Sequence, residues 1–395
     1  MPSPRLTVRA CGAVADIPAA DWDRCANPPG QSFEESGGER FNPFITHSFL
    51  SALERSGSVG GRSGWTPQHL VVEDDAKRIV ACAPVYLKAH SQGEYVFDHG
   101  WAEAYARVGG GYYPKIQVAV PFTPVPGRRL LIASDAPPEA FDALVKGLRA
   151  VRRAIGASSI HVTFANALEC GGLHAEGFLA RTGEQYHFFN DGYADFDAFL
   201  GALSSRKRKA IKRERRDALG DDVTVEHVTG AALGQAHWDA FFAFYMDTGS
   251  RKWGRPYLTR AFFDLVGAAM PERIVLILAK RRGEYIAGAL NFVGDDAIYG
   301  RYWGSIEERP FLHFELCYYQ AVDYALAHGL KRVEAGAQGE HKLVRGYRAV
   351  ATHSAHELAD PRLSSAVADY LERERAAVEA DIAQAAAALP FRHED

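Results

Sequence analysis

Cysteine is scarce in this chain: only five of its 395 residues are cysteines. They stand at positions 11, 25, 82, 170 and 317, odd in number and without the closely spaced pairs that bind zinc. A disulfide framework and a cysteine metal site are therefore not expected. A reduced, cytosolic compartment fits this pattern best.

Long apolar runs and a net positive charge are missing too. The longest apolar run covers residues 274–279, far short of the roughly 20 residues that cross a bilayer. No signal peptide is expected, because the amino terminus mixes prolines and arginines without an apolar core. The net charge of −4 argues against a globally basic nucleic-acid binder but is compatible with a local basic patch. We expect a cytoplasmic protein, and leave open a peripheral contact with the inner face of the membrane.

Apolar residues make up 47% of the chain, and its length suggests two or three domains. The order of predicted elements is similar in the two halves, where a meander of short strands precedes helices and further strands. We predict an α/β (α+β) fold with two duplicated domains, residues 1–194 and 195–395. Each is expected to hold a mixed, mostly antiparallel sheet flanked by helices. The second should begin with a basic helix and finish with a carboxy-terminal helix.

The densest polar cluster follows a short predicted strand in the second half. Apolar spacing between Phe314 and Ala325 predicts a core helix, and residues 330–335 predict a buried strand. The run Gly336-Ala337-Gln338-Gly339-Glu340-His341-Lys342, with Arg345 behind it, supplies an amide, a carboxylate, an imidazole and two cations. Open α/β sheets carry ligands past the ends of strands, so we interpret this run as a functional site. The alternative is a solvated loop with ion pairs.

A strongly basic helix is predicted over residues 205–216, which contain eight cations and one acid. Such a helix holds a polyanion by point charges and bidentate arginine contacts. Its ligand is then a nucleotide phosphate, a tRNA backbone or an anionic membrane surface; the alternative is a solvated helix that only maintains solubility. The cations expected to bind the polyanion are Arg206, Lys207, Arg208, Lys209, Lys212 and Arg213.

In the first half, an acid and an imidazole stand among aromatic residues. Asp98, His99 and Trp101 follow a strand predicted at residues 94–97, and Lys115 comes shortly after. These side chains either line a pocket or pack beneath a glycine-rich loop, because aromatic residues serve both purposes.

Four segments carry a resemblance to a known family. They are residues 93–99 (GEYVFDH), 113–115 (YPK), 314–320 (FELCYYQ) and 336–342 (GAQGEHK). These segments resemble the FemAB-like branch of the GNAT acyltransferase superfamily, a branch labelled with peptidoglycan biosynthesis. The similarity covers most of the chain, from Asn42 to His356.

The resemblance implies a pair of GNAT-like domains, N-acyl transfer to an amine, and a place in lipid or cell-envelope biosynthesis. One departure concerns the donor. GNAT enzymes that use acetyl-CoA cradle its pyrophosphate in a glycine-rich turn, whereas this chain has Ile306-Glu307-Glu308-Arg309-Pro310-Phe311-Leu312 there. Either an acyl-CoA enters between splayed strands near residues 302–304 with its phosphates held elsewhere, or the donor is an acyl carrier protein or an aminoacyl-tRNA.

Acyl transfer to an amine needs a base for the ammonium proton and hydrogen-bond donors for the oxyanion. Glu340 or His341 is the expected base, and Lys342, Arg345 or a strand N–H is the expected oxyanion donor. No metal and no permanently bound cofactor are expected. The expected substrate-binding residues are Tyr302, Trp303, Glu334, Gln338, Asp98, His99, Trp101 and Lys115. Those of the first half form either the acceptor pocket or a vestigial site.

Three hypotheses follow for the function. The first is an N-acyltransferase that moves an acyl group from a thioester, acyl-CoA or acyl carrier protein, to a primary amine such as an amino-lipid or sphingoid-like base. The second is an aminoacyl-tRNA-dependent transferase acting on a peptidoglycan precursor. The third is a non-catalytic module that binds an anion or a lipid surface.

Overall fold

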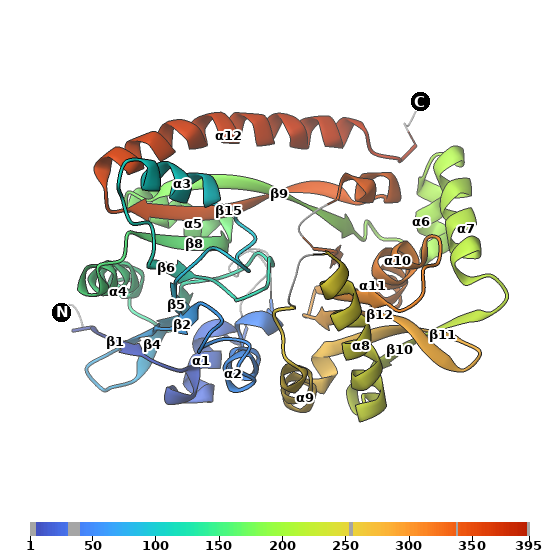
Figure 1. Ribbon diagram of the computed structural model, residues 1–395, viewed down its shortest axis with the longest axis horizontal. Helices are drawn as coiled ribbons and strands as arrows, with labels where there is room; N and C mark the ends of the chain where they lie inside the picture. The colour runs from blue at the N-terminus through green and yellow to red at the C-terminus, as the bar shows by residue number, and fades with distance from the viewer. Residues whose placement is uncertain (1–4, 31–39, 253–255, 337–338, 393–395) are drawn as a thin grey trace. The chain divides into compact units, whose positions relative to one another are not determined.

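The computed structural model describes residues 5–30, 40–252, 256–336 and 339–392, and Figure 1 shows the path of the chain. Two compact units are formed, the first by residues 1–183 with 351–379 and the second by residues 184–350 with 380–395. The chain passes between the units within β9 (Leu179–Phe189), within β15 (Arg348–Leu358) and within α12 (Pro361–Ala387). The boundary predicted between residues 194 and 195 stays a prediction, because compactness alone does not test which segments fold as one domain.

The first unit contains two groups of paired strands, β1-β3-β4-β7 and β2-β5-β6-β8-β15. Its strands are β1 (Thr7–Cys11), β2 (Trp65–Pro67), β3 (His69–Glu73), β4 (Ile79–Ala83), β5 (Val85–Lys88), β6 (Lys115–Val118), β7 (Leu131–Ile132) and β8 (Ser159–Ala165). Its helices are α1 (Ala19–Ala26), α2 (His47–Arg55), α3 (His99–Arg107), α4 (Ala140–Ile155) and α5 (Ala167–Ala175), with most of α12. The apolar face of α4 packs Leu144, Val145 and Leu148 into the core with β3, β4 and β8.

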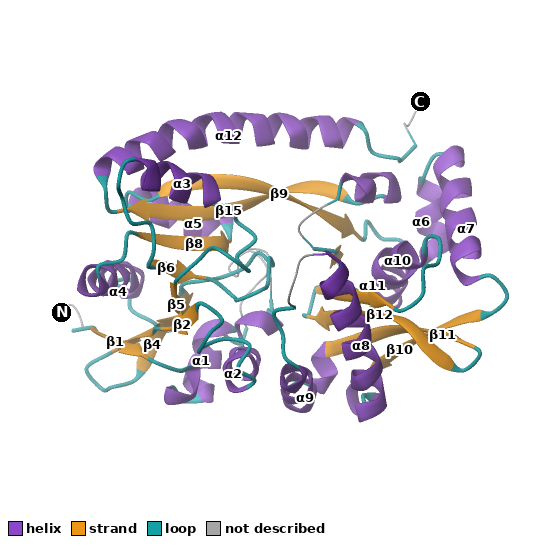
Figure 2. Cartoon of the chain, in the orientation of Figure 1, coloured by secondary structure: helices purple, strands orange, loops and turns teal. Residues whose placement is uncertain are grey.

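The second unit holds a sheet in the order β10-β11-β12-β13-β14-β9, drawn as orange arrows in Figure 2. The strands are β10 (Val223–Thr229), β11 (Ile274–Arg281), β12 (Glu284–Val293), β13 (Ala297–Ser305) and β14 (Arg332–Glu334). The helices are α6 (Phe196–Ala202), α7 (Ser205–Leu219), α8 (Gln235–Lys252), α9 (Arg260–Ala269), α10 (Leu312–Phe314), the π-helix η5 (Glu315–Tyr319), α11 (Gln320–Ala327) and the 3-10 helix η6 (Glu340–Arg345).

Alternation along β11 and β12 explains how this sheet is covered on both faces. Val275, Ile277 and Ala289 belong to the core formed with η5 and α11. Gly288 lies on the opposite face, where a Cβ atom would meet Phe241 and Phe244 of α8. The nearly continuous apolar run at residues 274–279 is therefore a strand buried on both sides.

The two units repeat one series of strand pairings. In the first unit β1/β3, β3/β4 and β5/β6 are antiparallel, β6/β8 is parallel and β8/β15 is antiparallel. In the second, β10/β11, β11/β12 and β12/β13 are antiparallel, β13/β14 is parallel and β14/β9 is antiparallel. The predicted fold class, duplicated mixed and mostly antiparallel sheets with flanking helices, is confirmed.

The last strand of each unit is exchanged. Strand β9 follows β8 in the chain but pairs with β14, and β15 follows β14 but pairs with β8. One local prediction was wrong: residues 94–97 form a bend rather than a strand, and the helix α3 follows them. None of the helices in the described part of the chain is long and apolar enough for a membrane crossing.

Candidate functional site

The sheet of the second unit forks between β13 and β14. These strands pair in parallel only from Ala297 to Tyr299, opposite Arg332 to Glu334, after which β13 continues to Ser305 paired with β12 but not with β14. A cavity of about 120 Å³ opens beyond the paired part, between β12, β13, η5 and the residues that follow β14. The predicted Tyr302 and Trp303 both line it, together with Cys317, Tyr318 and Gly336. A parallel strand pair that separates in this way leaves unpaired backbone groups for a ligand.

Lys342 lies beside this cavity as a buried cation. The residue is 1% exposed, and its ammonium donates to the carbonyl oxygen of Gly336, a cavity-lining residue, at 2.8 Å. No carboxylate of the described residues pairs with it, although its Nζ is 5.9 Å from the Tyr318 ring centroid. Burial lowers the pKa of Lys342 to about 8, so the ammonium still predominates at pH 7. The Lys342 ammonium uses one N–H group in its hydrogen bond to Gly336 and can donate another to an oxygen atom of a ligand.

His341 contacts the same cavity through a tyrosine. Its Nε2 lies 2.8 Å from the hydroxyl of Tyr318. Burial raises the pKa of Tyr318, so the hydroxyl remains protonated, and in the tautomer of His341 that carries its proton on Nδ1 it donates to Nε2. Burial and the neighbouring Arg345 and Lys342 lower the pKa of His341, which keeps the imidazole neutral and able to accept a proton at pH 7.

Arg345 holds the polar segment in place. It donates from Nε to Tyr319 Oη at 3.0 Å, from Nη1 to the His341 carbonyl at 2.7 Å and from Nη2 to Glu214 at 2.9 Å. Its guanidinium also stacks 3.6 Å from the Phe314 ring centroid. Each nitrogen has a partner, so the contacts describe a residue that orients His341 and Lys342; its predicted role as an oxyanion donor stays a prediction.

Glu334 ends the paired part of β14 and is almost fully buried. Arg332 donates to its Oε1 at 2.8 Å, whereas Oε2 has no hydrogen-bond partner and lies 3.9 Å from His187 Nε2. Burial raises the pKa of Glu334 and lowers the pKa of His187 to about 3. The predicted Gln338 and the side chain of Glu340 lie outside the described residues.

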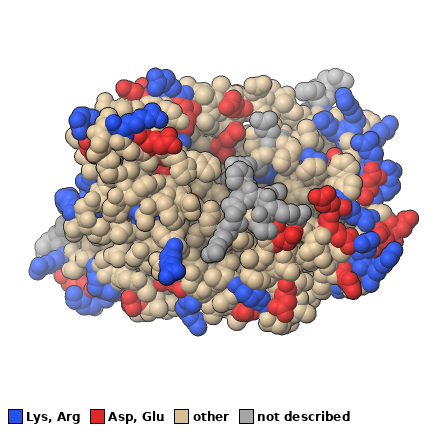
Figure 3. Space-filling view, in the orientation of Figure 1, with Lys and Arg blue, Asp and Glu red and all other residues tan. Residues whose placement is uncertain are grey.

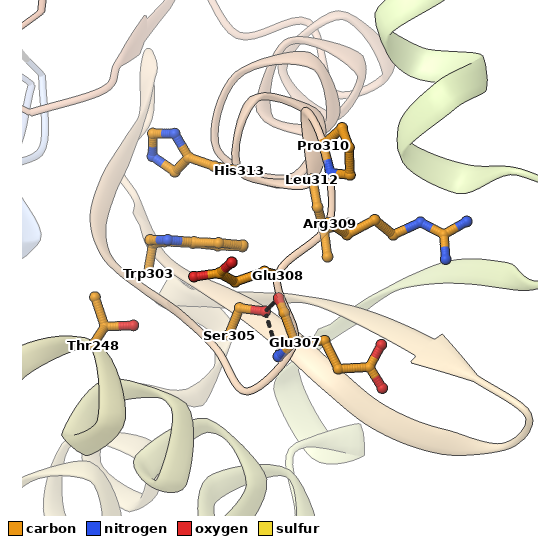
Figure 4. A pocket seen from close by; sticks show the side chains of 9 residues that line it. All are labelled: Thr248, Trp303, Ser305, Glu307, Glu308, Arg309, Pro310, Leu312 and His313. Carbon is orange, nitrogen blue, oxygen red and sulfur yellow. Dashed lines mark hydrogen bonds between the residues drawn. The ribbon is translucent and has the colours of Figure 1, made fainter. Parts of the chain in front are cut away.

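A larger cavity of about 580 Å³ adjoins the first and shares Trp303 and His313 with it (Figure 4). The loop before α10 forms one wall. Glu308 turns toward Trp303, whereas Arg309 points away from the cavity. Arg309 donates to the carbonyls of Ala218 and Leu219 and to Asp222.

The same wall does not resemble a phosphate cradle. Glu307 pairs with Arg281 at 2.7 Å, and Glu308 adds a second carboxylate next to the start of α10. The Glu308 carboxylate turns toward the cavity (Figure 4) and opposes the binding of an anion there, whereas Glu307 is paired with Arg281 and Arg309 is occupied elsewhere. The absence of a glycine-rich turn noted in the sequence therefore corresponds to an acidic wall.

The basic helix is α7, and Figure 3 shows lysine and arginine side chains gathered near its place in Figure 1. Two of its charged residues face inward: Arg215 pairs with Glu315 and Asp323, and Glu214 pairs with Arg345. Lys212 reaches Asp197 at 3.1 Å. The predicted cations without an ion pair among the described residues are Arg206, Lys207, Arg208, Lys209 and Arg213.

In the first unit, Asp98, Lys115 and Trp101 come together in a closed polar cluster. The fully buried Lys115 ammonium donates to Ser91 at 2.8 Å, to Glu94 at 2.7 Å and to Asp98. Trp101 packs edge-on against His356, 5.0 Å between ring centroids. His99 is exposed and stacks on Phe97 outside the cluster.

The electrostatics of this cluster follow from its burial. Burial raises the pKa of Glu94 to about 7. Burial would also raise the pKa of Asp98, but the Lys115 ammonium overcomes it and holds that pKa well below its usual range. His161 and His356, 2.7 Å apart between their Nδ1 atoms, are both neutral because burial depresses their pKa values.

The fork of the first unit is filled by the protein itself. Strands β6 and β8 form its parallel pair, and beyond them Gly127 forms a bridge with Ala165. The fully buried Arg129 donates to the carbonyls of Thr163 and Val125 at 3.0 and 2.6 Å. At the fork of the first unit, backbone carbonyls are therefore bonded to Arg129, whereas the equivalent part of the second unit faces a cavity.

The structure therefore brings Lys342, His341, Arg345, Tyr302 and Trp303 to one fork and leaves the first-unit residues in a separate cluster. Sequence reasoning missed Tyr318 and Asn291, both of which line the cavity at the fork. Tyr318 lies within the quoted segment 314–320, whose aromatic residues were interpreted only as core. Its position on a π-helix, which often marks functional sites, was not readable from spacing.

The fold and this site define a duplicated mixed α/β protein with one open and one closed fork. The chain belongs to the FemAB-like family, described as peptidoglycan biosynthesis/recognition, whose model matches residues 13–393. A comparison with curated proteins finds no match.

Solved structures share the fold at low sequence identity. FemX is 14% identical with a TM-score of 0.53, and the match covers 89% of this chain and 98% of FemX. The carboxy-terminal domain of a putative lysylphosphatidylglycerol synthetase from Agrobacterium fabrum is 10% identical with a TM-score of 0.50, covering 89% and 96%. L-PGS from Bacillus licheniformis is 10% identical with a TM-score of 0.50, covering 85% and 98%.

Proposed function

We propose that the protein transfers an acyl group from an activated carrier to a primary amine at the fork of the second unit. The observation that carries this proposal is the buried Lys342 ammonium beside the cavity, without a carboxylate partner among the described residues. An unpaired buried cation is costly to a fold, and it is useful where negative charge develops during a reaction. Family membership and the FemX-like fold agree with a transferase.

In this proposal, groups at the fork take part in each step of the transfer. The amine nitrogen attacks the carbonyl carbon, and the Lys342 ammonium stabilises the resulting oxyanion. The nitrogen gives up its proton to the Tyr318 hydroxyl, which passes its own proton to His341 Nε2. Collapse of the intermediate expels the carrier's thiolate or alkoxide, which takes a proton from His341 by the reverse route. An amide is formed and the carrier is released.

The first donor that we propose is a thioester, acyl-CoA or acyl carrier protein, with an amino-lipid or sphingoid-like base as the first acceptor to test. The acidic wall at Glu307 and Glu308 supports an arrangement in which carrier phosphates lie away from α10. The fork is open in the second unit and closed in the first. This difference supports the second unit as the active half.

Amide formation from acyl-CoA, acyl carrier protein and a panel of amines tests the proposal. In the relay that we propose, Tyr318→Phe and His341→Ala interrupt the same proton path. Each is expected to slow turnover by about 10²-fold, and the double variant should be no slower than the single ones.

His174→Ala, at an exposed position on α5, is the matched control and should leave the rate unchanged. Additive losses for the two site variants would contradict the relay. No amide product with any donor and amine would contradict a transferase and favour the non-catalytic module for anions or lipids.

The aminoacyl-tRNA alternative is favoured by one observation, the unpaired cations of α7. The lysylphosphatidylglycerol synthetase named above is similar in fold, and its name describes an aminoacyl lipid product. If α7 holds a tRNA backbone, binding should weaken steeply with salt, with a slope of roughly 0.7 to 0.9 per phosphate contact.

Neutralising Arg206, Lys207 and Arg208 is then expected to reduce the salt slope by about 2 to 3. Neutralising two exposed cations of α4, Lys146 and Arg153, is the control and should leave the slope unchanged. Binding that does not respond to salt would contradict this alternative. Binding of the α7 cations to anionic vesicles instead would identify a peripheral membrane contact.

A further inference from the structure

Among the described residues, a buried hydrogen-bond acceptor at the fork, Asn291 Oδ1, has no partner. Asn291 lies on β12, is fully buried and lines the cavity of about 120 Å³. Its Oδ1 is buried and makes no hydrogen bond to the described residues. Buried side-chain acceptors are nearly always satisfied in folded proteins, so this atom needs an explanation.

The orientation of the Asn291 amide is fixed by its other end. Nδ2 donates to the carbonyl oxygens of Val275 at 3.3 Å and of Ala289 at 3.2 Å. If the amide were flipped, Oδ1 would face both carbonyl oxygens. All three atoms are acceptors, so no hydrogen bond would form. Oδ1 therefore has to point to the far side.

That far side is the mouth of the fork. Asn291 is paired with Gly300 across a register shift in β12/β13, and a Cβ atom at Gly300 would lie 3.4 Å from Oδ1. The lack of a side chain at Gly300 keeps the space before Oδ1 open. Gly300 lines the same cavity, and Ala335 and Gly336 close it from the other strand.

We infer that Asn291 is a binding residue whose Oδ1 accepts a hydrogen bond from an N–H group of the ligand in the fork. This inference rests on the proposed function. The cavity measures about 120 Å³. It thus admits a slender group such as a secondary amide or a small ammonium group, and not a whole long acyl chain.

Two sources supply this N–H group. One is the secondary amide of a pantetheine arm, and the other is the α-ammonium of an aminoacyl ester. Both place the N–H a few bonds from the reacting carbonyl, which Lys342 receives in the proposed mechanism. Asn291 then contributes to the binding of the carrier arm or of the acyl group. The residues that carry out the transfer are Lys342, Tyr318 and His341.

The test compares pairs of probes that differ only in this N–H. The first pair is S-acetylpantetheine and its analogue with an ester oxygen in place of the amide nitrogen nearest the sulfur. The second pair is the alanyl amide and the propionyl amide of 3′-amino-3′-deoxyadenosine. Affinities for the wild type, Asn291→Leu and Asn291→Asp are measured by calorimetry, with melting temperatures as the folding control.

Loss of the N–H is expected to weaken wild-type binding about 10-fold in the pair that uses the fork. Asn291→Leu should abolish this difference. Asn291→Asp should strengthen only the alanyl probe, because a carboxylate favours an ammonium group, and this separates the two sources. A purely structural asparagine would lower the melting temperature without changing the difference between paired probes.

Binding of both pairs without any N–H dependence in the wild type overturns the Asn291 subsite but leaves the proposed function standing. Failure of all four probes to bind the wild type overturns the proposed function together with the subsite. The wild-type comparison alone decides these outcomes if Asn291→Leu does not fold.

Discussion

Replacing Lys342 by methionine is expected to slow amide formation by about 10²- to 10³-fold, the usual effect of removing one preorganised oxyanion donor. The reason is the position of its ammonium, buried beside the fork and bonded only to the Gly336 carbonyl among the described residues. Methionine keeps the length of the side chain and removes the charge. The decrease should appear in kcat and kcat/KM alike, because the interaction forms as the oxyanion develops.

The same substitution has a separate signature in stability. The folded-state pKa of Lys342 is lowered from 10.5 to about 8, so between these values the unfolded chain holds a proton that the folded chain has lost. The wild-type free energy of unfolding therefore rises by up to about 3 kcal/mol as pH increases from 8 to 10.5. Lys342→Met lacks this gain, so its stability relative to the wild type is highest below pH 8 and decreases between pH 8 and 10.5.

Denaturant unfolding at pH 7, 9 and 10.5 measures this difference, and Lys146→Met on the surface of α4 is the matched control. Full turnover by Lys342→Met would rule out the oxyanion role. A difference in stability that does not change with pH would show that Lys342 is as solvated as a surface lysine.

The sequence predicted the elements around Lys342 well, because local patterns determine them. The basic helix α7 begins at the predicted residue, Ser205, and the short strand β14 lies within residues 330–335. Gly336 and Gly339 both adopt positive φ, 81° and 120°, which only glycine does at low cost, so the turn could be predicted as well.

Partners far apart in the chain could not be predicted. Arg345 pairs with Glu214 across 131 positions, and His161 faces His356 across 195. Spacing indicates which residues share a helix face, yet it does not indicate which strands meet. The exchange of β9 and β15 depends on such pairing, and so does the closing of the first fork by Arg129. The strand predicted at residues 94–97 failed for the same reason, since Glu94 turns inward to reach Lys115 instead of joining a sheet.

Lys115→Met is expected to give the largest loss of stability, about 3 to 5 kcal/mol in the free energy of unfolding at pH 7. The substitution leaves the buried carboxylates of Asp98 and Glu94 facing each other without their cation. Their folded-state pKa values then rise above the unfolded values, so the loss should shrink as pH falls toward 4 and both acids take up protons.

A matched pair of variants separates charge from packing in this cluster. Lys88 is equally buried, but its nearest carboxylate oxygen is 3.7 Å away, and burial lowers its pKa to about 7. Lys88→Met should therefore cost no more than about 1.5 kcal/mol, because a lysine that is half neutral loses little charge pairing. Adding Asp98→Asn to Lys115→Met should restore more than half of the loss, since Glu94 takes up a proton near pH 7 once its cation is gone and Asp98 carries most of the unpaired charge. Equal losses for Lys88→Met and Lys115→Met, without rescue by Asp98→Asn, would mean that packing and not the Lys115 ion pairs holds this cluster together.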